Sequence, residues 1–274
     1  MNKPEQEKLR LEEKLQQAED YIKKSNDLTQ LNKTLKNLQK KLLKAKRNKY
    51  IDEFILPENL GIDEDNVIVY LIDVGSINEG NLGWWRAPLN QRGFGHLDLD
   101  MCCKLIINDL KVGKKVSLGF EYSGFIPVGT DILMIGKARK DEESSWSAQF
   151  NPLGVGMQET LYVFDKLREE LTDTVKPTFT LKEFKKSSNL LLWEAIITKK
   201  SKPKTMEISI SHLNDCLFGV DQFKQNFQSN KLGYDVDAEE CFNVIGAALL
   251  RSNLSKELKL LATKCYVVRP NHTS

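Results

Sequence analysis

A short, β-branched apolar run at residues 68–74 (IVYLIDV) contains one acidic residue, Asp73. The turn signal Gly75-Ser76 follows the run, a pattern typical of a strand buried on both faces of a sheet. An acid at the carboxyl end of such a strand faces the crevice where open α/β sheets bind ligands. The alternative is that Asp73 only caps the turn through its own backbone.

Apolar spacing along the rest of the chain predicts an α/β domain with a mixed sheet flanked by helices. Strands are expected over residues 82–88, 93–97, 115–127, 189–198 and 265–269. Helices are expected over residues 98–110, 153–171 and 237–252, and from His212 onward. Residues 129–152 show weak periodicity and are expected to form mostly an inserted loop. Two of these strands also carry an acid amid apolar neighbours: Glu121 and Glu194.

Residues 1–50 are expected to form an N-terminal coiled-coil arm, because Pro4 can open a helix and no glycine occurs over residues 4–49. Apolar residues follow the three-four spacing of a coiled-coil seam in two groups, Leu11, Leu15, Ala18 and Ile22, then Leu28, Leu31, Leu35, Leu38 and Leu42. Since so narrow a seam needs a partner helix, we expect a homo-oligomer or another helical partner. The alternative is a single helix lying on its own globular domain.

Basic residues are concentrated in the second half of this arm. Residues 33–49 contain eight Lys or Arg residues and no acidic residue. Such a run is often only the solvated face of a helix. It also suits phosphate binding, which needs cations and no particular sequence. We therefore expect nucleic acid to contact Lys36, Lys40, Lys44 and Arg47.

Residues 51–66 are acidic and contain the breakers Pro57 and Gly61, so they are expected to be a linker to an α/β domain over residues 67–274. No apolar run approaches the roughly 20 residues of a membrane helix, and the N-terminus lacks the apolar core of a secretory signal. The five cysteines show no metal-binding spacing, which favours reduced thiols. These features predict a cytoplasmic protein without a membrane partner.

Three strand-borne acids, Asp73, Glu121 and Glu194, are costly to bury unless a positive charge compensates them. Asp215, beside His212 in the sequence, is a fourth candidate. Converging carboxylates suit Mg²⁺ or Mn²⁺ better than Zn²⁺, and two such ions could clamp the oxygens of a phosphodiester. Each acid taken singly could instead be a structural carboxylate, and Asp215 could be a helix N-terminal acid.

Four short segments bear these acids: IDVG at residues 72–75, GFEYSGFIP at 119–127, LLLWEA at 190–195 and HLNDC at 212–216. Over roughly residues 67–250, their order and form resemble a group of predicted nucleases in the ribonuclease-H-like superfamily, which includes retroviral integrases and Holliday-junction resolvases. That group reads IDxG, GFExPxFxP, LxxWEA and HxxDA. Cys216 stands where its pattern has alanine, and Tyr122-Ser123 departs from its proline-bearing segment.

The resemblance implies a ribonuclease-H-like sheet and a metal-dependent nuclease. By position, Asp73, Glu121 and Asp215 would be ligands of Mg²⁺ or Mn²⁺, and Glu194 would be a further catalytic acid. Water activated on the ions would then hydrolyse a phosphodiester bond of nucleic acid.

Two other functions compete with a nuclease. One is a non-catalytic coiled-coil adaptor, or a nucleic-acid-binding subunit of a larger complex, whose acids would not converge. The other is an actin-like ATPase, because residues 73–76 (DVGS) also resemble the first phosphate loop of that class. An actin-like protein needs a second acidic, glycine-rich turn, and none is found after residue 130.

The seam of the arm makes a testable prediction. Replacing Leu31 and Leu38 together with Lys places charge in the seam, so an oligomer should become a monomer in sedimentation. An unchanged mass would show that the seam lies on the protein's own surface instead.

Overall fold

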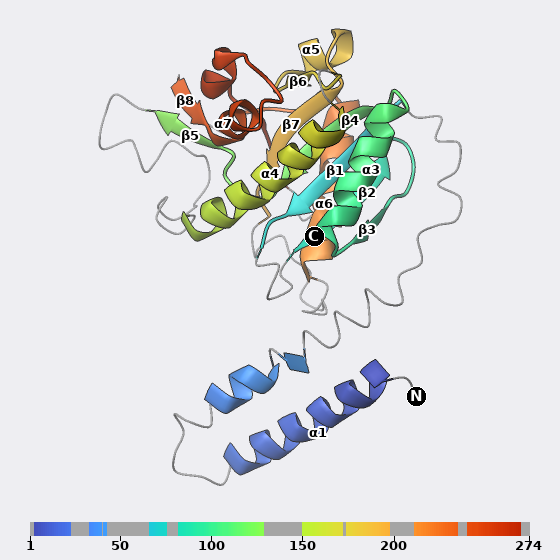
Figure 1. Cartoon of the computed structure of the whole chain (residues 1–274), viewed down its shortest axis with the longest axis vertical. Coiled ribbons are helices and arrows are strands. Elements are labelled where there is room, and N and C mark those ends of the chain that lie inside the picture. The colour runs from blue at the N-terminus through green and yellow to red at the C-terminus, as the bar shows by residue number, and fades with distance from the viewer. Residues whose placement is uncertain are drawn as a thin grey trace.

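A mixed sheet forms the centre of the α/β domain (Figure 1). The computed structural model describes residues 3–22, 33–39, 41–42, 66–75, 82–128, 150–171, 174–197, 211–234 and 240–269. Within these ranges the main sheet consists of β1 (Val67–Asp73), β2 (Gly83–Pro88), β3 (Phe94–His96), β4 (Lys115–Phe120), β6 (Pro177–Thr178), β7 (Leu190–Ala195) and β9 (Tyr266–Val268).

Strand β1 lies inside this sheet and pairs with β2 on one side and β4 on the other. The β1–β2 pair is antiparallel, with Leu71 opposite Trp85. The β1–β4 pair is parallel, with Ile72 opposite Phe120. The sheet order is β3-β2-β1-β4-β7-β6, and β9 pairs with β7. β1 is therefore an inner strand, and it lies next to the strand that precedes Glu121.

The strand predicted over residues 115–127 is divided in the structure. β4 ends at Phe120, and the chain then leaves the main sheet as β5 (Phe125–Val128). β5 pairs with β8 (Glu240–Asn243) in a separate two-stranded sheet. A pairing between segments more than 100 residues apart leaves no signal in local apolar spacing.

The helix predicted over residues 237–252 is wrong at its start for the same reason. Residues 240–243 form β8, and α7 (Val244–Arg251) begins after them. The side chain of Asn243 accepts a hydrogen bond of 2.8 Å from the backbone N–H of Gly246, as a helix N-cap does. The cap at Asn243 and the pairing of β8 with β5 together fix the start of α7 at Val244.

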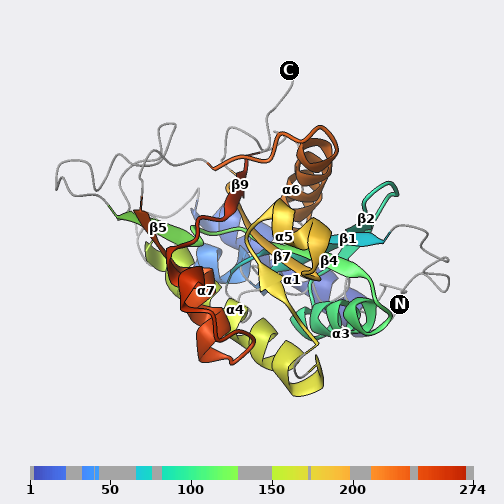
Figure 2. The same cartoon turned by 90° about the horizontal axis from the view of Figure 1, so that it is seen from above.

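Helices cover both faces of the sheet, which confirms the flanked α/β architecture. Figure 2 shows α3 (Leu99–Lys111), α4 (Phe150–Leu171) and α7 on one side and α6 (Ser211–Gln228) on the other. The helices expected over residues 98–110 and 153–171 are confirmed, and Asp98 caps α3 by accepting from the N–H of Asp100 at 2.9 Å. The short elements β6, α5 (Leu181–Lys186) and the 3-10 helix η6 (Leu258–Ala262) were not predicted.

Alternation along the buried strands divides the core into two clusters. In β1, Tyr70 and Ile72 face the layer of α3, α4 and α7, whereas Val69 and Leu71 face α6. All four of these side chains are fully buried, so neither face of β1 meets solvent. This explains why the strand reads as a continuous apolar run instead of an alternating one.

A buried ion pair ties β1, β2 and α3 together. The guanidinium of Arg86 donates two hydrogen bonds of 2.9 Å to the carboxylate of Asp109. The hydroxyl of Tyr70 donates to the same carboxylate at 2.6 Å. Burial raises the pKa of Tyr70 well above its ordinary value, so the phenol stays neutral and remains a donor.

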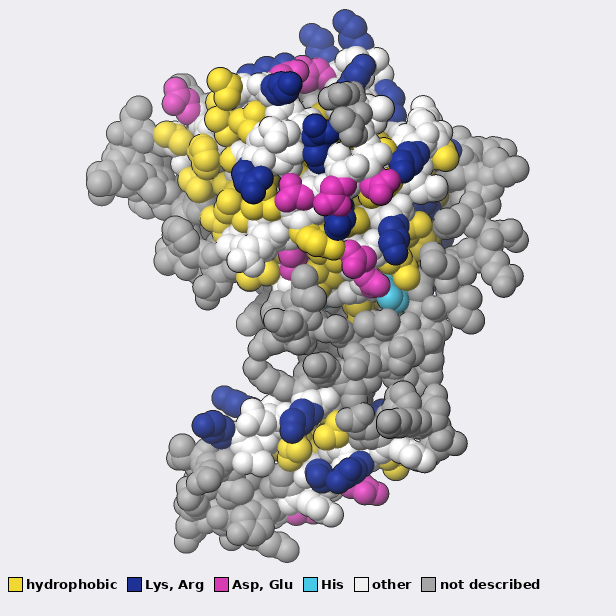
Figure 3. Space-filling model, viewed as in Figure 1, with side chains coloured by type: hydrophobic (Ala, Val, Ile, Leu, Met, Phe, Trp, Pro, Cys, Tyr) yellow, Lys and Arg dark blue, Asp and Glu magenta, His cyan; other side chains and the backbone are white. Residues whose placement is uncertain are grey.

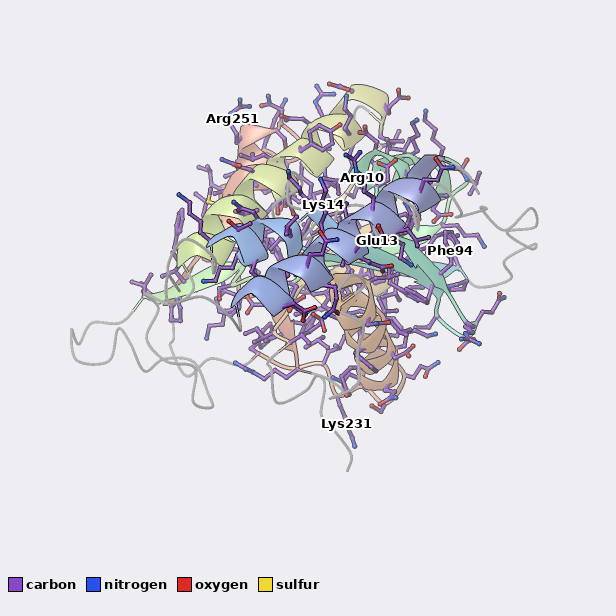
Figure 4. All side chains as sticks on the ribbon, turned by 90° about the horizontal axis from the view of Figure 1, so that it is seen from below. Arg10, Glu13, Lys14, Phe94, Lys231 and Arg251 are labelled. Atoms are coloured by element: carbon purple, nitrogen blue, oxygen red, sulfur yellow. The ribbon has the colours of Figure 1, made fainter. Side chains whose placement is uncertain are left out.

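The described part of the N-terminal arm is helical. α1 (Lys3–Ile22) begins beside Pro4, and residues 33–39 are also helical. Figure 4 labels Arg10, Glu13 and Lys14 on α1, and all three are exposed, whereas Leu11 and Leu15 are half-buried. Leu28 and Leu31 lie outside the described residues, so pairing through the seam stays a prediction.

Charged side chains of both signs are interspersed over the face formed by α3 and α4 (Figure 3). Toward β5, β8 and α7 the same view shows more apolar surface. Phe242 of β8 has 45% of its surface exposed. Across the described ranges, no helix combines the length and the apolar character needed to cross a membrane.

Removing the buried carboxylate of Asp109 tests how the sheet is held to α3. Asp109→Ala leaves the Arg86 guanidinium buried without its partner, so the free energy of unfolding should fall by roughly 3–5 kcal/mol. Urea denaturation followed by circular dichroism measures this change. The matched control is Glu170→Gln, which removes the exposed ion pair of Glu170 with Lys111 and should leave the midpoint unchanged. Equal effects of the two variants would contradict the prediction.

Candidate metal centre

Two predicted acids lie side by side at the carboxyl ends of β1 and β4. Asp73 is the last residue of β1, and Glu121 directly follows β4. The N–H of Glu121 donates to the carbonyl of Ile72 at 2.9 Å, which continues the parallel ladder by one residue. Because Ile72 and Phe120 both face the α4 layer, alternation turns Asp73 and Glu121 toward α6.

The first turns of α6 bring two more side chains to this point. His212 and Asp215 are three residues apart on the helix and therefore share a face. The Nδ1 atom of His212 lies 2.6 Å from Oδ2 of Asp73. Ligand atoms of Asp73, His212 and Asp215 all lie within 4.8 Å of one another. The two aspartates are almost completely buried and His212 is half-buried, so the cluster is open on the histidine side.

Two glycines let α6 approach the sheet this closely. A Cβ atom at Gly83 of β2 would lie 2.7 Å from the backbone nitrogen of Leu213. A Cβ atom at Gly219 of α6 would lie 2.1 Å from the side chain of Leu71. At Gly83 the close atom belongs to the backbone of α6, so only glycine allows the helix and β2 to meet there. At Gly219 a larger residue would require the side chain of Leu71 to move. The approach sets His212 and Asp215 beside Asp73.

The thiol of Cys216 fills the space beneath the cluster. Its Sγ accepts a hydrogen bond of 3.1 Å from the N–H of Asp73 and donates one of 3.2 Å to the carbonyl of Gly83. Burial, followed by the charges of Asp73, Glu121 and Asp215, raises the pKa of this thiol well above its ordinary value. All three carboxylates are therefore within electrostatic reach of one sulfur atom, and the thiol stays protonated.

Glu194, the remaining predicted acid, lies elsewhere. It is opposite Phe120 in the β4–β7 ladder and so faces the α4 and α7 layer, away from α6. Its Oε2 accepts a hydrogen bond of 2.8 Å from the N–H of Gly124 and is 3.9 Å from the thiol of Cys265. With β4 between β1 and β7, the two strands are also about 10 Å apart. The structure therefore does not bring Glu194 to the cluster.

Glu159 of α4, which the sequence analysis missed, reaches the same strand end from the opposite layer. Only 3% of its surface is exposed, and its Oε1 accepts a hydrogen bond of 3.3 Å from the N–H of Gly75. Burial raises the pKa of Glu159 to about 8, against the opposing effects of that N–H and of the charge on His212. The sequence did contain a signal for this residue, because Glu159 lies at helical spacing from the buried residues Val163 and Leu167 and is therefore an acid on the inward-facing side of the helix.

The donor set fits a divalent cation. Two buried carboxylates and one half-buried imidazole offer three ligand atoms from a single small volume. Carboxylate oxygens suit Mg²⁺ and Mn²⁺, whereas imidazole shifts the preference toward transition metals. Of the two predicted ions, Mn²⁺ fits this mixed set better than Mg²⁺. His212 was present in the motif but was not predicted as a ligand.

The predicted nucleic-acid contacts lie mostly outside the described residues. Lys36 is exposed on the helical segment of residues 33–39. The side chain of Lys40, together with Lys44 and Arg47, falls in parts of the arm that the structure does not describe. Contact of this stripe with phosphates remains a prediction.

We compared the chain with models of protein families, with curated proteins and with solved structures, and none of them matches it.

The buried carboxyl of Glu159 predicts a pH dependence of stability. Its pKa is raised from 4.5 to about 8, so between these values the folded protein holds a proton that the unfolded chain releases. Stability should therefore fall as pH rises from 5 to 8.5. Replacing Glu159 with Gln should reduce that fall by roughly 2–4 kcal/mol.

Urea denaturation in chelator at pH 5, 6.5 and 8.5 measures both proteins. Glu170→Gln, on the exposed face of the same helix, is the control and should follow the wild type. If Glu159→Gln also follows the wild type, the carboxyl of Glu159 titrates in its ordinary range.

Proposed function

We propose that the protein is a divalent-cation-dependent nuclease of the ribonuclease-H-like type, with Asp73, His212 and Asp215 as its principal cation ligands. The observation that carries the proposal is the cluster itself. Three ligand atoms from two elements 139 residues apart lie within 4.8 Å of one another at the carboxyl end of an inner strand. Glu121 lies on the neighbouring strand and the same face, outside the group of three ligand atoms, and we assign it as a supporting acid.

The order of elements supports this proposal. A strand ending on Asp73 is followed by the antiparallel strands β2 and β3, helix α3, a parallel strand before Glu121, helix α4, a third parallel strand, and the helix of Asp215. This is the order that suggested the ribonuclease-H-like superfamily from the sequence. The added elements β5, β6 and α5 do not interrupt the ladder from β2 to β7.

A bound divalent cation would supply a Lewis acid that lowers the pKa of a coordinated water and neutralises charge on the phosphoryl oxygens. The protein would contribute orientation. Asp73 is fixed by its place in the ladder, and Asp215 by complete burial on α6. A ring nitrogen of His212 that binds a cation carries no proton. Coordination through Nδ1 would replace the contact with Asp73, whereas coordination through Nε2 would keep Nδ1–H as a donor to Asp73.

Glu121 follows β4 and can act on the side of the cluster away from β2. A carboxylate there can accept a proton from water or hold a further water in place. The exposed imidazole edge of His212 marks the side from which a substrate would enter. Substrate phosphates farther from the cluster would contact Lys36, Lys40, Lys44 and Arg47, and pairing of the arm would bring two such stripes together.

The close approach of Asp73 and Asp215 favours a nuclease over a non-catalytic adaptor. Acids kept only as turn or cap residues have no reason to share one volume, whereas Asp73 and Asp215 do so from different elements. The adaptor remains the outcome if the cluster binds no cation.

The test is cleavage of labelled single- and double-stranded DNA and RNA in Mg²⁺, Mn²⁺ or chelator. Cleavage should require the cation, and Asp73→Asn or Asp215→Asn should reduce its rate roughly 100-fold or more while the circular dichroism spectrum is kept. Asp221→Asn, an exposed position on the same helix as Asp215, is the control and should cleave like the wild type. Cleavage that survives both ligand substitutions, or that persists in chelator, would refute the proposal.

A further inference from the structure

We propose that Glu159 of α4 is a ligand for a second divalent cation at the candidate metal centre. This inference rests on the proposed function, because it assumes that the cluster of Asp73, His212 and Asp215 binds a first cation. It adds a residue from the opposite helical layer, which none of the sequence motifs contains.

The contact with Gly75 places Glu159 at the end of β1. Its Oε1 accepts from the N–H of Gly75 at 3.3 Å. Gly75 lies two residues beyond Asp73, so the two Cα atoms are at most about 7 Å apart. His212 contacts Asp73 from α6, and Glu159 contacts Gly75 from α4, so these two helices approach the same strand end from opposite sides of the sheet (Figure 2).

The second carboxyl oxygen of Glu159 points to a ligand. Oε2 is buried and accepts no hydrogen bond from any residue that the structure describes. Whether the carboxyl is protonated or ionised, a buried Oε2 without a hydrogen-bond partner is costly, and a coordinated cation would replace the proton and satisfy this oxygen. Oε1 alone already serves the turn, so fixing Gly75 does not account for Oε2.

Contacts next to Glu159 hold α4 in place. The hydroxyl of Tyr122 forms a hydrogen bond of 2.8 Å with the hydroxyl of Thr160, the residue after Glu159. One turn earlier, a Cβ atom at Gly156 would lie 2.6 Å from the Tyr122 ring, so a glycine is needed for this approach. The helix backbone is thus packed against the segment that follows β4, and the Glu159 side chain is directed at the strand ends.

Charge favours more than one cation. Asp73, Glu121, Asp215 and Glu159 are four carboxyl groups near one strand end. Two divalent cations would relieve the repulsion among the ionised carboxylates. Asp73 is the last residue of β1, two residues before Gly75, so among the proposed ligands it is the nearest in sequence to the contact of Glu159. Two ions would also clamp the attacking and leaving oxygens of a phosphodiester.

Replacing Glu159 with Gln distinguishes a role in cation binding from a role in holding the turn at Gly75. Glu159→Gln keeps an oxygen that can accept from Gly75 but removes the negative charge. Mn²⁺ binding, measured by the electron paramagnetic resonance of free Mn²⁺ and by calorimetry, should show two ions on the wild-type protein. Glu159→Gln should keep one ion and bind the second at least 10-fold more weakly. Glu159→Met should do the same, and Glu170→Gln should match the wild type.

Circular dichroism in chelator checks that each variant is folded. Two ions bound with unchanged affinity by Glu159→Gln and Glu159→Met would overturn this inference and leave the proposed function intact. If the wild type binds no Mn²⁺, or Asp73→Asn binds it as the wild type does, the proposed function fails as well. A wild-type protein with one ion that Glu159→Gln does not weaken would also overturn the inference.

Discussion

The parallel pairing of β1 with β4 is buried on both faces, and the geometry of the candidate metal centre depends on its register. Ile72 and Phe120 lie opposite each other in the α4 layer, so the next residue of each strand turns toward α6. A slip of one residue would send every side chain of a strand to the other face. It would drive Asp73 into the apolar layer and break the packing of Ile72. The hydrophobic core and the site are therefore held by the same constraint.

Two residues that differ from the motifs of the nuclease group resembled in sequence have local contacts in this structure. Cys216, in place of alanine, bonds the backbones of β1 and β2 through one sulfur atom and so ties the first turns of α6 to both strands. Tyr122, in the segment that lacks the expected proline, bonds Thr160 and packs over Gly156, which holds α4 against the same strand ends. The contacts of Cys216 and Tyr122 therefore hold two helices that carry candidate ligands.

Most of the main sheet could be predicted because its strands are buried on both faces and its helices have strong periodicity and caps. Asp98 marks the start of α3 in the sequence as clearly as in the structure. The failures share a different cause. β5 and β8 exist because they pair with each other across more than 100 residues, so the predicted strand ran on past Phe120 and the predicted helix began before Val244. The two-residue strand β6 likewise depends on its partner β7.

Sequence reasoning could find those site acids that interrupt an apolar strand, but it found less easily an acid that interrupts the buried face of a helix. Asp73 stands out in IVYLIDV because the surrounding run is uniformly apolar. Glu159 breaks the buried stripe of α4 in the same manner, yet helices carry many acids and the signal is weaker. Glu194 shows that the rule is incomplete, since its carboxylate serves the backbone of Gly124 on the far face. Burial alone therefore marks an acid as unusual. Whether it can take part in a site depends on which face of the sheet its side chain occupies and on whether one of its carboxyl oxygens still lacks a hydrogen-bond partner.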